Sequence, residues 1–411
     1  MSVDHRELGR ELEFFTTTPI VGAGLPLWLP DGAIIRSELE KFAAEQAARS
    51  GCRGVYTPVM AKKELYERSG HWSKFSEDMF PEMQIGGESF LLRPANCPHH
   101  AQVFAARGRS YRELPFRLRE LGSMFRSELS GVLSGLSRVR QINLDDAHVF
   151  CTRDQVRAEV IVAIDAIEYC YSTLGIAERE YRLSIRGAVS GGAAGQYLGT
   201  DAQWATAEDQ LRSALNARSI DYVEAKGEAA FYGPKIDVQV RDANGREETL
   251  STVQLDFNQP ERFGLEYTAE DGTKDRPVMI HRGLLGSMER MTALLIERFE
   301  GRMPPWLAPN QVSILPVGDR HQDAAERLRA DLEARDVRVA VASEGALGRR
   351  IREARTHRDS YVAVIGDNEV RGGTVDTLIP ARDERAVVDA GVFVDQVVAD
   401  INERALLPAG F

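Results

Sequence analysis

Arginines and a glutamate suited to binding phosphate and adenine cluster between residues 125 and 140. The run FRSELSG occupies 125–131, and Arg138 and Arg140 follow it. The planar fork of an arginine binds phosphate oxygens with two hydrogen bonds, and a glutamate just after it can accept from an adenine amino group. A surface strand of mixed charge would have the same composition. The cluster by itself therefore leaves both interpretations open.

A cysteine and two histidines, far apart in the chain, could together form a metal site. Cys97 lies between prolines in RPANCPHH, and His148 and His281 follow at long intervals. Thiolate and imidazole are the ligands that zinc prefers. No short zinc motif is present, and a single histidine is more often a buried residue with satisfied hydrogen bonds. The spacing alone does not decide whether the three meet.

A third segment could present an arginine to a triphosphate. In MIHRGLLGSMERM, residues 279–291, glycine and serine precede a predicted helix that carries Arg290. A helix N-terminus and an arginine on it both favour anions. The alternative is an amphipathic helix with an exposed arginine.

A basic stripe lies near the C-terminus, although the chain as a whole is acidic. The net charge of −11 argues against a generic nucleic-acid-binding protein. Five arginines nevertheless fall within ten positions: Arg349, Arg350, Arg352, Arg355 and Arg358. They form either a solvated helix face or a surface that contacts phosphates.

Hairpin-linked strands and flanking helices predict an α+β unit built on an antiparallel sheet. Helical spacing covers residues 4–15 (Leu8, Leu12 and Phe15 on one face) and 34–50 (Ile35, Leu39 and Phe42). Further helices are expected at 154–175, 202–217 and 284–300, and a glycine-rich surface loop at 186–200. Strands are expected at 54–60, 88–94, 114–126 and 142–150, with a hairpin in 231–257 that turns at Asn244–Gly245.

The prolines of MPPWLAPN, residues 303–310, indicate a boundary. Beyond them strands (311–317, 337–342, 360–366) alternate with helices (321–335, 348–358), which predicts a small α/β domain on a mixed sheet. The expected domains are therefore residues 1–304 and 305–411.

The composition is that of an ordinary globular protein, with 43% hydrophobic and 27% charged residues. No apolar run is long enough for a membrane helix, and the charged N-terminus does not resemble a signal peptide. A cytoplasmic protein without a membrane partner is expected. The four cysteines form no CxxC pair, and Cys151 and Cys170 are expected to be buried thiols.

Taken together, these segments resemble the threonyl-tRNA synthetases over essentially the whole chain. LPLWLPDGAIIRSELEKF with GVYTPVM resembles class II motif 1, including Pro58. MFRSE with RVR resembles motif 2, and GLLGSMERM resembles motif 3. LRPANCPHH, DDAHVFCT, FYGPKID and STVQLDF are similar to blocks specific to that family. The resemblance implies the class II synthetase fold, followed by an α/β anticodon-binding domain.

The resemblance also implies roles for particular residues. Cys97, His148 and His281 match the family's zinc ligands, one ion per chain. Asp146, Tyr232 and Gln254 match the amino-acid pocket, and Arg126, Glu128, Arg138 and Arg290 match contacts to ATP, which is bound with Mg²⁺. Arg126, Arg290 and Lys235 are the expected catalytic residues, and Arg349, Arg350 and Glu369 the expected tRNA contacts.

The implied activity is that of a threonine–tRNA ligase: L-threonine is activated with ATP to threonyl-adenylate and transferred to tRNA. A homodimer through the motif 1 region is expected. The family's usual N-terminal editing region has no counterpart in the sequence given, so the expected ligase lacks cis editing, and a separate editing protein is an expected partner.

Six positions depart from the family pattern: His99, Ser134, Ile142, Leu144, Gln259 and Leu378. Leu378 stands where an arginine usually reads the anticodon, and Gln259 replaces an apolar residue near the pocket. Two alternatives therefore stay open beside the ligase. One is a synthetase-like paralog that activates an amino acid for a non-standard acceptor or serves as an inhibitor-tolerant second copy. The other is a non-catalytic sensor, which the retained ligands and arginines disfavour.

Overall fold

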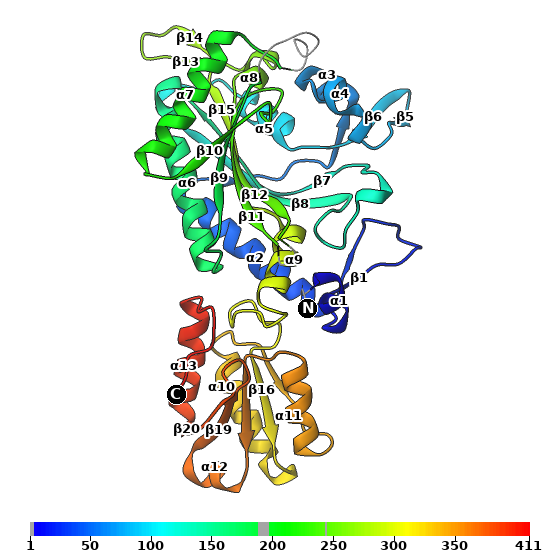
Figure 1. The fold of residues 1–411 in the computed structure, drawn as a ribbon, viewed down its shortest axis with the longest axis vertical. Coiled ribbons are helices and arrows are strands. Elements are labelled where there is room, and N and C mark those ends of the chain that lie inside the picture. Colours follow the sequence, from blue (N-terminus) through cyan, green and yellow to red (C-terminus); the bar gives the residue numbers. More distant parts are fainter. Residues whose placement is uncertain (1–3, 188–196, 243–244) are drawn as a thin grey trace.

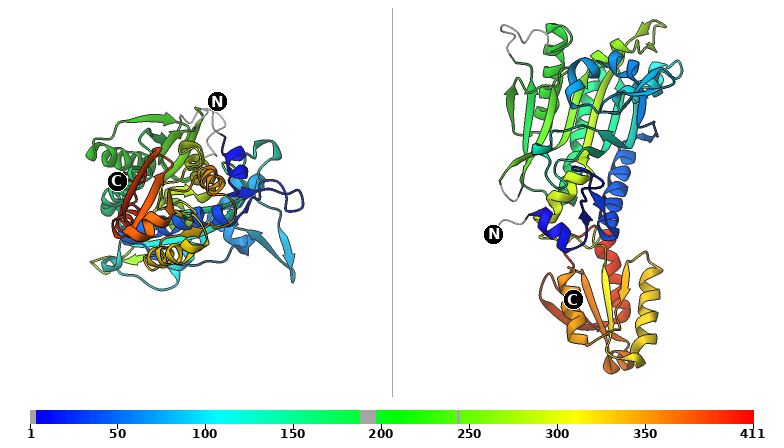
Figure 2. Two further views of the ribbon diagram at one scale, coloured as in Figure 1. Left: turned by 90° about the horizontal axis from the view of Figure 1, so that it is seen from below. Right: turned by 90° about the vertical axis from the view of Figure 1, so that its right-hand side faces the viewer.

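The structure is a computed structural model, and it describes residues 4–187, 197–242 and 245–411. Two units are stacked end to end, a larger one around an eight-stranded sheet and a smaller C-terminal one around a five-stranded sheet (Figure 1). The N-terminal helix α1 (His5–Glu11) lies near the junction of the two units, as both side views show (Figures 1 and 2). Within the described ranges, no helix has the length and apolarity that crossing a membrane requires.

The large sheet has the strand order β10–β9–β11–β12–β15–β8–β7–β3. Its inner pairs are antiparallel, and only the two outermost pairs, β10 with β9 and β3 with β7, are parallel. The expected antiparallel sheet is thus confirmed. The strands are β3 (Arg53–Gly54), β7 (Phe116–Phe125), β8 (Gln141–Cys151), β9 (Glu180–Ile185), β10 (Tyr222–Lys226), β11 (Lys235–Arg241), β12 (Glu247–Asp256) and β15 (Val278–Ser287).

The two faces of this sheet have different covers. Successive residues of a strand point to opposite faces, and Val149 and Phe150 of β8 accordingly belong to different clusters of the core. Long helices cover one face: α2 (Pro30–Arg49), α6 (Val156–Thr173), α7 (Asp201–Ala217) and α9 (Met288–Arg298). Short helices lie over the other: α3 (Lys63–Ser69), α4 (His71–Phe75), α5 (Cys97–Ala105) and α8 (Asn258–Arg262). The second face leaves room for a cavity.

Smaller elements complete the first unit. A three-stranded sheet has the order β4–β6–β5, and two short hairpins pair β1 with β2 and β13 with β14. These strands are β1 (Phe15–Thr16), β2 (Leu27–Trp28), β4 (Met60–Lys62), β5 (Met83–Ile85), β6 (Glu88–Leu92), β13 (Tyr267–Thr268) and β14 (Lys274–Asp275). Within the described residues, the 3₁₀ turns of this unit are η1 (Ser76–Asp78), η2 (Tyr111–Glu113), η3 (Ser130–Val132) and η4 (Arg153–Gln155).

The C-terminal unit confirms the expected α/β domain on a mixed sheet. Its order is β17–β16–β18–β19–β20. The pairs β17–β16 and β16–β18 are parallel, and the pairs β18–β19 and β19–β20 are antiparallel. The strands are β16 (Val312–Pro316), β17 (Val339–Val341), β18 (Tyr361–Ile365), β19 (Thr374–Ile379) and β20 (Glu384–Asp389). The helices are η6 (Asp319–His321), α10 (Gln322–Glu333), α11 (Leu347–Thr356), α12 (Asp367–Gly372) and α13 (Ala390–Asn402).

Several expected boundaries were wrong. The helix expected at 284–300 begins at Met288, because β15 continues to Ser287, whose Oγ accepts from Arg290 N–H (3.0 Å) and caps α9. The helix expected at 34–50 begins at Pro30, a residue well suited to the first helical turn. The first helix ends at Glu11, so Phe15 belongs to β1 instead.

Only the two ends of the segment 54–60, which was expected to be one strand, belong to strands. In its middle, Thr57 hydrogen-bonds the Glu120 side chain and does not pair with a neighbouring strand. The predicted loop at 186–200 lies mostly outside the described residues, as does Asn244 of the predicted turn. The hairpin itself is confirmed by the antiparallel pairing of β11 with β12.

The segment between the units is tightly packed. Trp306 and Leu307 are buried in the core of the first unit, and the Trp306 ring contacts Phe42 of α2 edge-on (5.4 Å between centroids). Arg338 of the second unit donates to the carbonyls of Trp306 (2.8 Å) and Ala308 (2.9 Å) and pairs with Glu38 of α2. The division at 304/305 stays a prediction, since residues just after it pack with the first unit.

Candidate active site

A cavity of about 520 Å³ opens on the sheet face that the short helices cover. Residues of β7, β8, β12 and β15 form its floor, and α4, the start of α5 and the segment before β11 supply its walls. Because β-strand side chains alternate, Ile142, Leu144, Asp146 and His148 of β8 all face this cavity. The site thus depends on strands that are distant in sequence but adjacent in the sheet.

The structure brings Cys97, His148 and His281 together at one end of the cavity. Their potential ligand atoms all lie within 4.8 Å of one another, and all three residues are buried. His281 is the register partner of His148 across β15 and β8, and Cys97 begins α5 above them. Antiparallel pairing explains why two histidines separated by more than a hundred residues become neighbours.

Neighbouring groups determine which ring nitrogen of each histidine is free. His281 Nε2 lies 3.0 Å from Asp256 Oδ2, so it donates its proton there, and its Nδ1 lone pair faces His148 Nε2 at 3.0 Å. On the other side, His148 Nδ1 contacts His100 Nδ1 (2.7 Å), and His100 Nε2 contacts Glu120 (3.1 Å). A proton on His100 Nε2 leaves its Nδ1 to accept from His148. Two ring lone pairs then converge beside the Cys97 sulfur.

This donor set fits a zinc ion. Structural and catalytic zinc sites use thiolate and imidazole ligands, and each ligating histidine typically donates its other N–H to a carboxylate or a relay to one. Burial raises the pKa of the Cys97 thiol and lowers the pKa of His148. A neutral imidazole is the metal-binding form, and a cation at this point would favour the buried thiolate.

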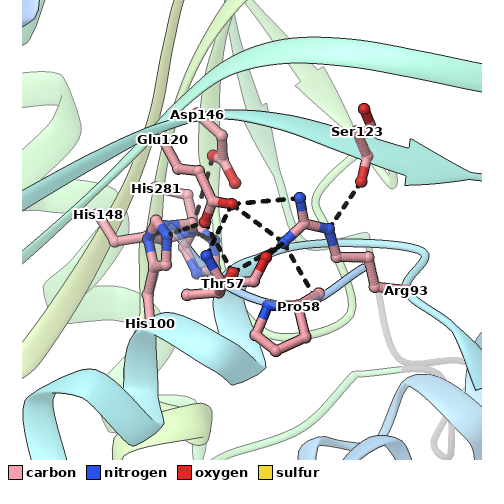
Figure 3. Close-up of polar contacts among 9 residues, drawn as sticks. All are labelled: Thr57, Pro58, Arg93, His100, Glu120, Ser123, Asp146, His148 and His281. Atoms are coloured by element: carbon pink, nitrogen blue, oxygen red, sulfur yellow. Dashed lines mark hydrogen bonds and ion pairs between the residues drawn. The ribbon is translucent and has the colours of Figure 1, made fainter. Parts of the chain in front are cut away.

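Glu120 connects this end of the cavity to the motif 1 segment (Figure 3). Its carboxylate accepts from Thr57 N–H (3.1 Å), Thr57 Oγ1 (2.7 Å) and Arg93 Nη1 (3.2 Å) in addition to His100. Burial raises its pKa, but the hydrogen bonds from His100 and Thr57 outweigh burial and hold the value at about 2. Arg93 also donates to the carbonyls of Pro58 (3.3 Å) and Ser123 (2.7 Å). Glu120 is therefore a fixed anion.

The residues expected to bind an amino acid lie beside the metal-binding donors. The Tyr232 ring stacks on His281 (5.0 Å between centroids), and its hydroxyl donates to Gln254, the register partner of His281. Asp146 Oδ1 lies 3.8 Å from His148 Nε2. All three side chains line the cavity. Lys235 is the register partner of Gln254, but its ammonium pairs with Asp237 and does not line the cavity.

The residues expected to bind ATP line the opposite end. Arg126 is held with its guanidinium over the Phe75 ring (5.7 Å), and burial lowers its pKa. Arg290 donates to the carbonyls of Ser137 (3.2 Å) and Thr249 (2.8 Å), and Arg138 pairs with Glu128 (2.8 Å). Arg290 also pairs with Glu248 (3.4 Å), whereas the buried Nε of Arg126 has no hydrogen-bond partner among the described residues, which favours an anionic ligand there. The cavity therefore has one metal-binding end and one anion-binding end.

Sequence reasoning missed four residues that shape the site: His71, His100, Glu120 and Asp256. His71 lines the cavity with Nε2 3.7 Å from the Cys97 sulfur, and burial lowers its pKa to about 4, so the ring is neutral. The other three reach His148 and His281 only through tertiary contacts. The sequence offered one signal for His100, which lies close to the candidate ligand Cys97 in CPHH.

The residues expected to contact tRNA differ in exposure. Arg349 is exposed and pairs with Glu353 of its own helix (2.7 Å). Arg350 is buried and donates to the carbonyls of Pro316 (2.8 Å) and Ala342 (2.6 Å). The expectation that Arg350 lies on an exposed basic stripe was therefore wrong. Glu369 accepts from Gly366 N–H (2.9 Å) at the start of α12. Leu378 is buried against Leu315, Val362 and Val364.

Two family models match the chain. The tRNA synthetase class II core domain (G, H, P, S and T) matches residues 80–299, and an anticodon binding domain matches residues 311–400.

Similar relatives are a threonine–tRNA ligase of Listeria monocytogenes, 48% identical over 402 residues, and one of Streptococcus sanguinis, 46% identical over 407 residues. The alignments cover 97% and 98% of this chain but 62% of each relative, so the chain spans about 62% of their length. The crystal structure of the RNA binding domain of threonyl-tRNA synthetase from Cryptosporidium parvum superposes with a TM-score of 0.90 at 34% identity, covering 99% of both chains.

Proposed function

Because the chain belongs to the class II tRNA synthetases, we propose that it activates L-threonine with ATP and transfers the threonyl group to a tRNA. The observation that carries this proposal is one cavity with a Cys–His–His donor set at one end and Arg126 and Arg290 at the other. An amino acid held at the first end would direct its carboxylate toward a nucleotide held at the second.

Cys97, His148 and His281 would hold the zinc, which when bound supplies open ligand positions for the amino and hydroxyl groups of the substrate. Asp146, on the cavity floor, is placed to accept a hydrogen bond from the substrate hydroxyl. Valine is nearly isosteric with threonine but lacks the hydroxyl. A site whose polar groups require that hydroxyl rejects such an analogue strongly, by about 10⁴–10⁵-fold in known cases.

Adenylate formation is an in-line displacement at the α-phosphorus of ATP. A carboxylate oxygen of threonine forms the new bond, and pyrophosphate leaves with the electron pair of the broken bond. Arg126 is placed to neutralise the α-phosphate and carboxylate, and Arg290 to hold the terminal phosphate, with Mg²⁺ accompanying the nucleotide. Positioning and charge neutralisation supply most of the catalysis in such reactions. Glu128 and Arg138 would complete the nucleotide contacts.

The C-terminal unit would bind the tRNA, with Arg349 on a phosphate and Glu369 near the anticodon. We propose that the Lys235 ammonium leaves Asp237 when substrates bind in the cavity and then contacts them. A second copy of this chain is the expected partner at the motif 1 surface, and a separate editing protein is a proposed partner for mischarged tRNA.

The proposal is tested by ATP–pyrophosphate exchange with each of the twenty amino acids, followed by charging of total tRNA. Threonine should give the highest exchange rate, and the charged species should be threonine tRNA. Exchange with no amino acid, or with one that lacks a β-hydroxyl, would reject the proposal.

Leu378 favours a second candidate, a synthetase-like enzyme that loads a non-standard acceptor or serves as an inhibitor-tolerant copy. This side chain is packed in the core of the C-terminal unit and has no hydrogen-bond donor for a base edge. Ile142 and Leu144 also place apolar groups on the cavity floor. Charging threonine tRNA transcripts with each anticodon base varied separates the two: the strict ligase loses charging steeply, whereas the second candidate tolerates the changes.

A further inference from the structure

Gln259 is a buried amide directly behind the metal-binding donors. Its residue is only 1% exposed, and its short helix α8 packs against α5, which begins with Cys97, and β15, which carries His281. Burying an amide costs free energy unless its polar atoms are hydrogen-bonded. The partners of Gln259 therefore indicate what it does at this point.

Gln259 makes two of the four hydrogen bonds to the Asp256 carboxylate. Asp256 Oδ1 accepts the backbone N–H groups of Asn258 and Gln259, each at 2.8 Å. Asp256 Oδ2 accepts the Gln259 Nε2–H and lies 3.0 Å from both that nitrogen and His281 Nε2. The orientation of this carboxylate, and with it the free nitrogen of His281, depends on Gln259.

The same amide lowers the pKa of the Cys97 thiol, against the larger effect of burial, which raises it. Its oxygen Oε1 is buried and has no hydrogen-bond partner in the described part of the chain. Turning the amide over would place that oxygen against the Asp256 carboxylate, which repels it, so the NH₂ group faces Asp256.

We infer that Gln259 is a positioning residue of the metal site, whose amide orients Asp256 and thereby fixes the ring nitrogen that His281 presents to zinc. This inference rests on the zinc site of the proposed function. Outer-shell partners that fix the orientation of a metal ligand determine how well that ligand is presented.

The test compares the zinc affinity of the full chain with that of Gln259→Met, which keeps the side-chain length and removes both the donor and the acceptor. Metal-free protein is titrated with Zn²⁺ in competition with a chromophoric chelator. Gln259→Met should bind Zn²⁺ about 10–100-fold more weakly, as loss of an outer-shell partner typically does. Gln46→Met is the matched control, since Gln46 is a buried amide on α2, outside the cavity; its affinity should equal that of the unchanged chain.

Cobalt substitution supplies a readout that a general loss of stability would not move. The visible d–d bands of the Co²⁺-loaded chain should change in position and intensity in Gln259→Met, because Asp256 no longer holds the His281 ring in one orientation. If Gln259→Met does not fold, Gln259→Asn retains the backbone contact to Asp256 and shortens only the side chain. It should show the same two changes at smaller size.

The outcomes separate this inference from the zinc proposal. If the unchanged chain binds no Zn²⁺, the metal site itself is rejected, and the role of Gln259 with it. If the unchanged chain binds Zn²⁺ while the Gln259 variants retain its affinity within twofold and its cobalt spectrum, only the role of Gln259 is wrong.

Discussion

At the scale of single residues, the site is a set of side chains whose protonation depends on their partners. Glu120 and Asp256 each orient one histidine, directly or through His100, and the two free ring nitrogens converge near Cys97. Such relays fix the tautomer of a ligand before any metal arrives. The consequences can be tested one residue at a time.

Removing the thiol should remove the metal. Cys97→Ser replaces a soft ligand with a weak one, so the loss of zinc affinity should exceed the about 10–100-fold cost of an outer-shell change. Elemental analysis should find one zinc per unchanged chain and much less in the variant, with threonine-dependent pyrophosphate exchange lost in parallel. Cys151→Ser, a buried thiol in the other core cluster, should retain both. A folded, zinc-free unchanged chain would contradict this prediction.

Serine should also be activated, but less efficiently than threonine. It carries the same amino and hydroxyl groups and lacks one methyl, which is worth only about 1–3 kcal/mol of discrimination. Pyrophosphate exchange with serine should therefore proceed with a kcat/KM about 10–200-fold below that of threonine. Rejection by more than about 10⁴-fold would mean that the cavity recognises the methyl by some stronger means.

At the scale of elements, strand pairing and buried polar groups hold the functional segments. Asp359, just before β18, is buried with Oδ2 accepting from Ser313 Oγ of β16 (2.6 Å). Burial raises the pKa of Asp359 to about 6, although hydrogen bonds from Ser313 and Asn310 and the nearby His357 act in the opposite direction. Asp31 of α2 adds to the increase.

Stability should therefore fall as this carboxyl ionises. The folded chain binds the Asp359 proton more tightly than the unfolded chain, so the stabilisation is present below about pH 4 and lost as the pH rises through 6, by at most about 3 kcal/mol. Asp359→Asn should lack this loss and gain stability relative to the unchanged chain between pH 4.5 and 7.5. Denaturant unfolding across that range measures it, with the exposed Asp331→Asn as the control. Parallel pH profiles for Asp359→Asn and the unchanged chain would refute it.

At the scale of the whole molecule, α2 contacts both units. One side of this helix packs against β7, β8 and α9, while Glu38 and Glu45 pair with Arg338 and Arg404 of the C-terminal unit. The adjoining edge of the large sheet is formed by the two-residue strand β3, so most of β7 has no strand partner on that side among the described residues, although β8 pairs with it along its other side. Tyr56, which follows β3 closely, is an apolar side chain that is 98% exposed. An open edge with exposed apolar groups favours association.

Tyr56→Asp should therefore weaken a homodimer. A charge buried at an interface without a partner typically costs 2 kcal/mol or more, roughly a 30-fold increase in the dissociation constant. Sedimentation equilibrium of the full chain measures this change. Val387→Asp, at an exposed valine of β20, should leave the dimer unchanged. A monomeric unchanged chain, or equal dissociation constants for the two variants, would contradict the prediction.

Local patterns in the sequence sufficed for much of the architecture. The stripe of Ile35, Leu39 and Phe42 and the alternation in 114–126 and 142–150 correctly indicate a helix and two strands, because helix and strand periods depend on neighbouring residues alone. Boundaries were less accurate: the apolar run after Gly283 fits a helix or a strand equally well, and the pairing of Ser287 with Leu144 of β8 extends β15 to Ser287. The antiparallel sheet and the α/β C-terminal unit follow from the order of such elements.

The candidate site required more than local pattern. Cys97, His148 and His281 could be named as candidates from residue type and from resemblance, but their spacing gave no reason to expect that they meet. Register across β15 and β8 decided that. Tertiary packing alone determined the inward orientation of Arg350, the burial of Leu378 and the contacts of His100, Glu120, Asp256 and Gln259. The physical reason is that these side chains are satisfied by partners on other elements, and no short-range periodicity in a sequence records which elements become neighbours.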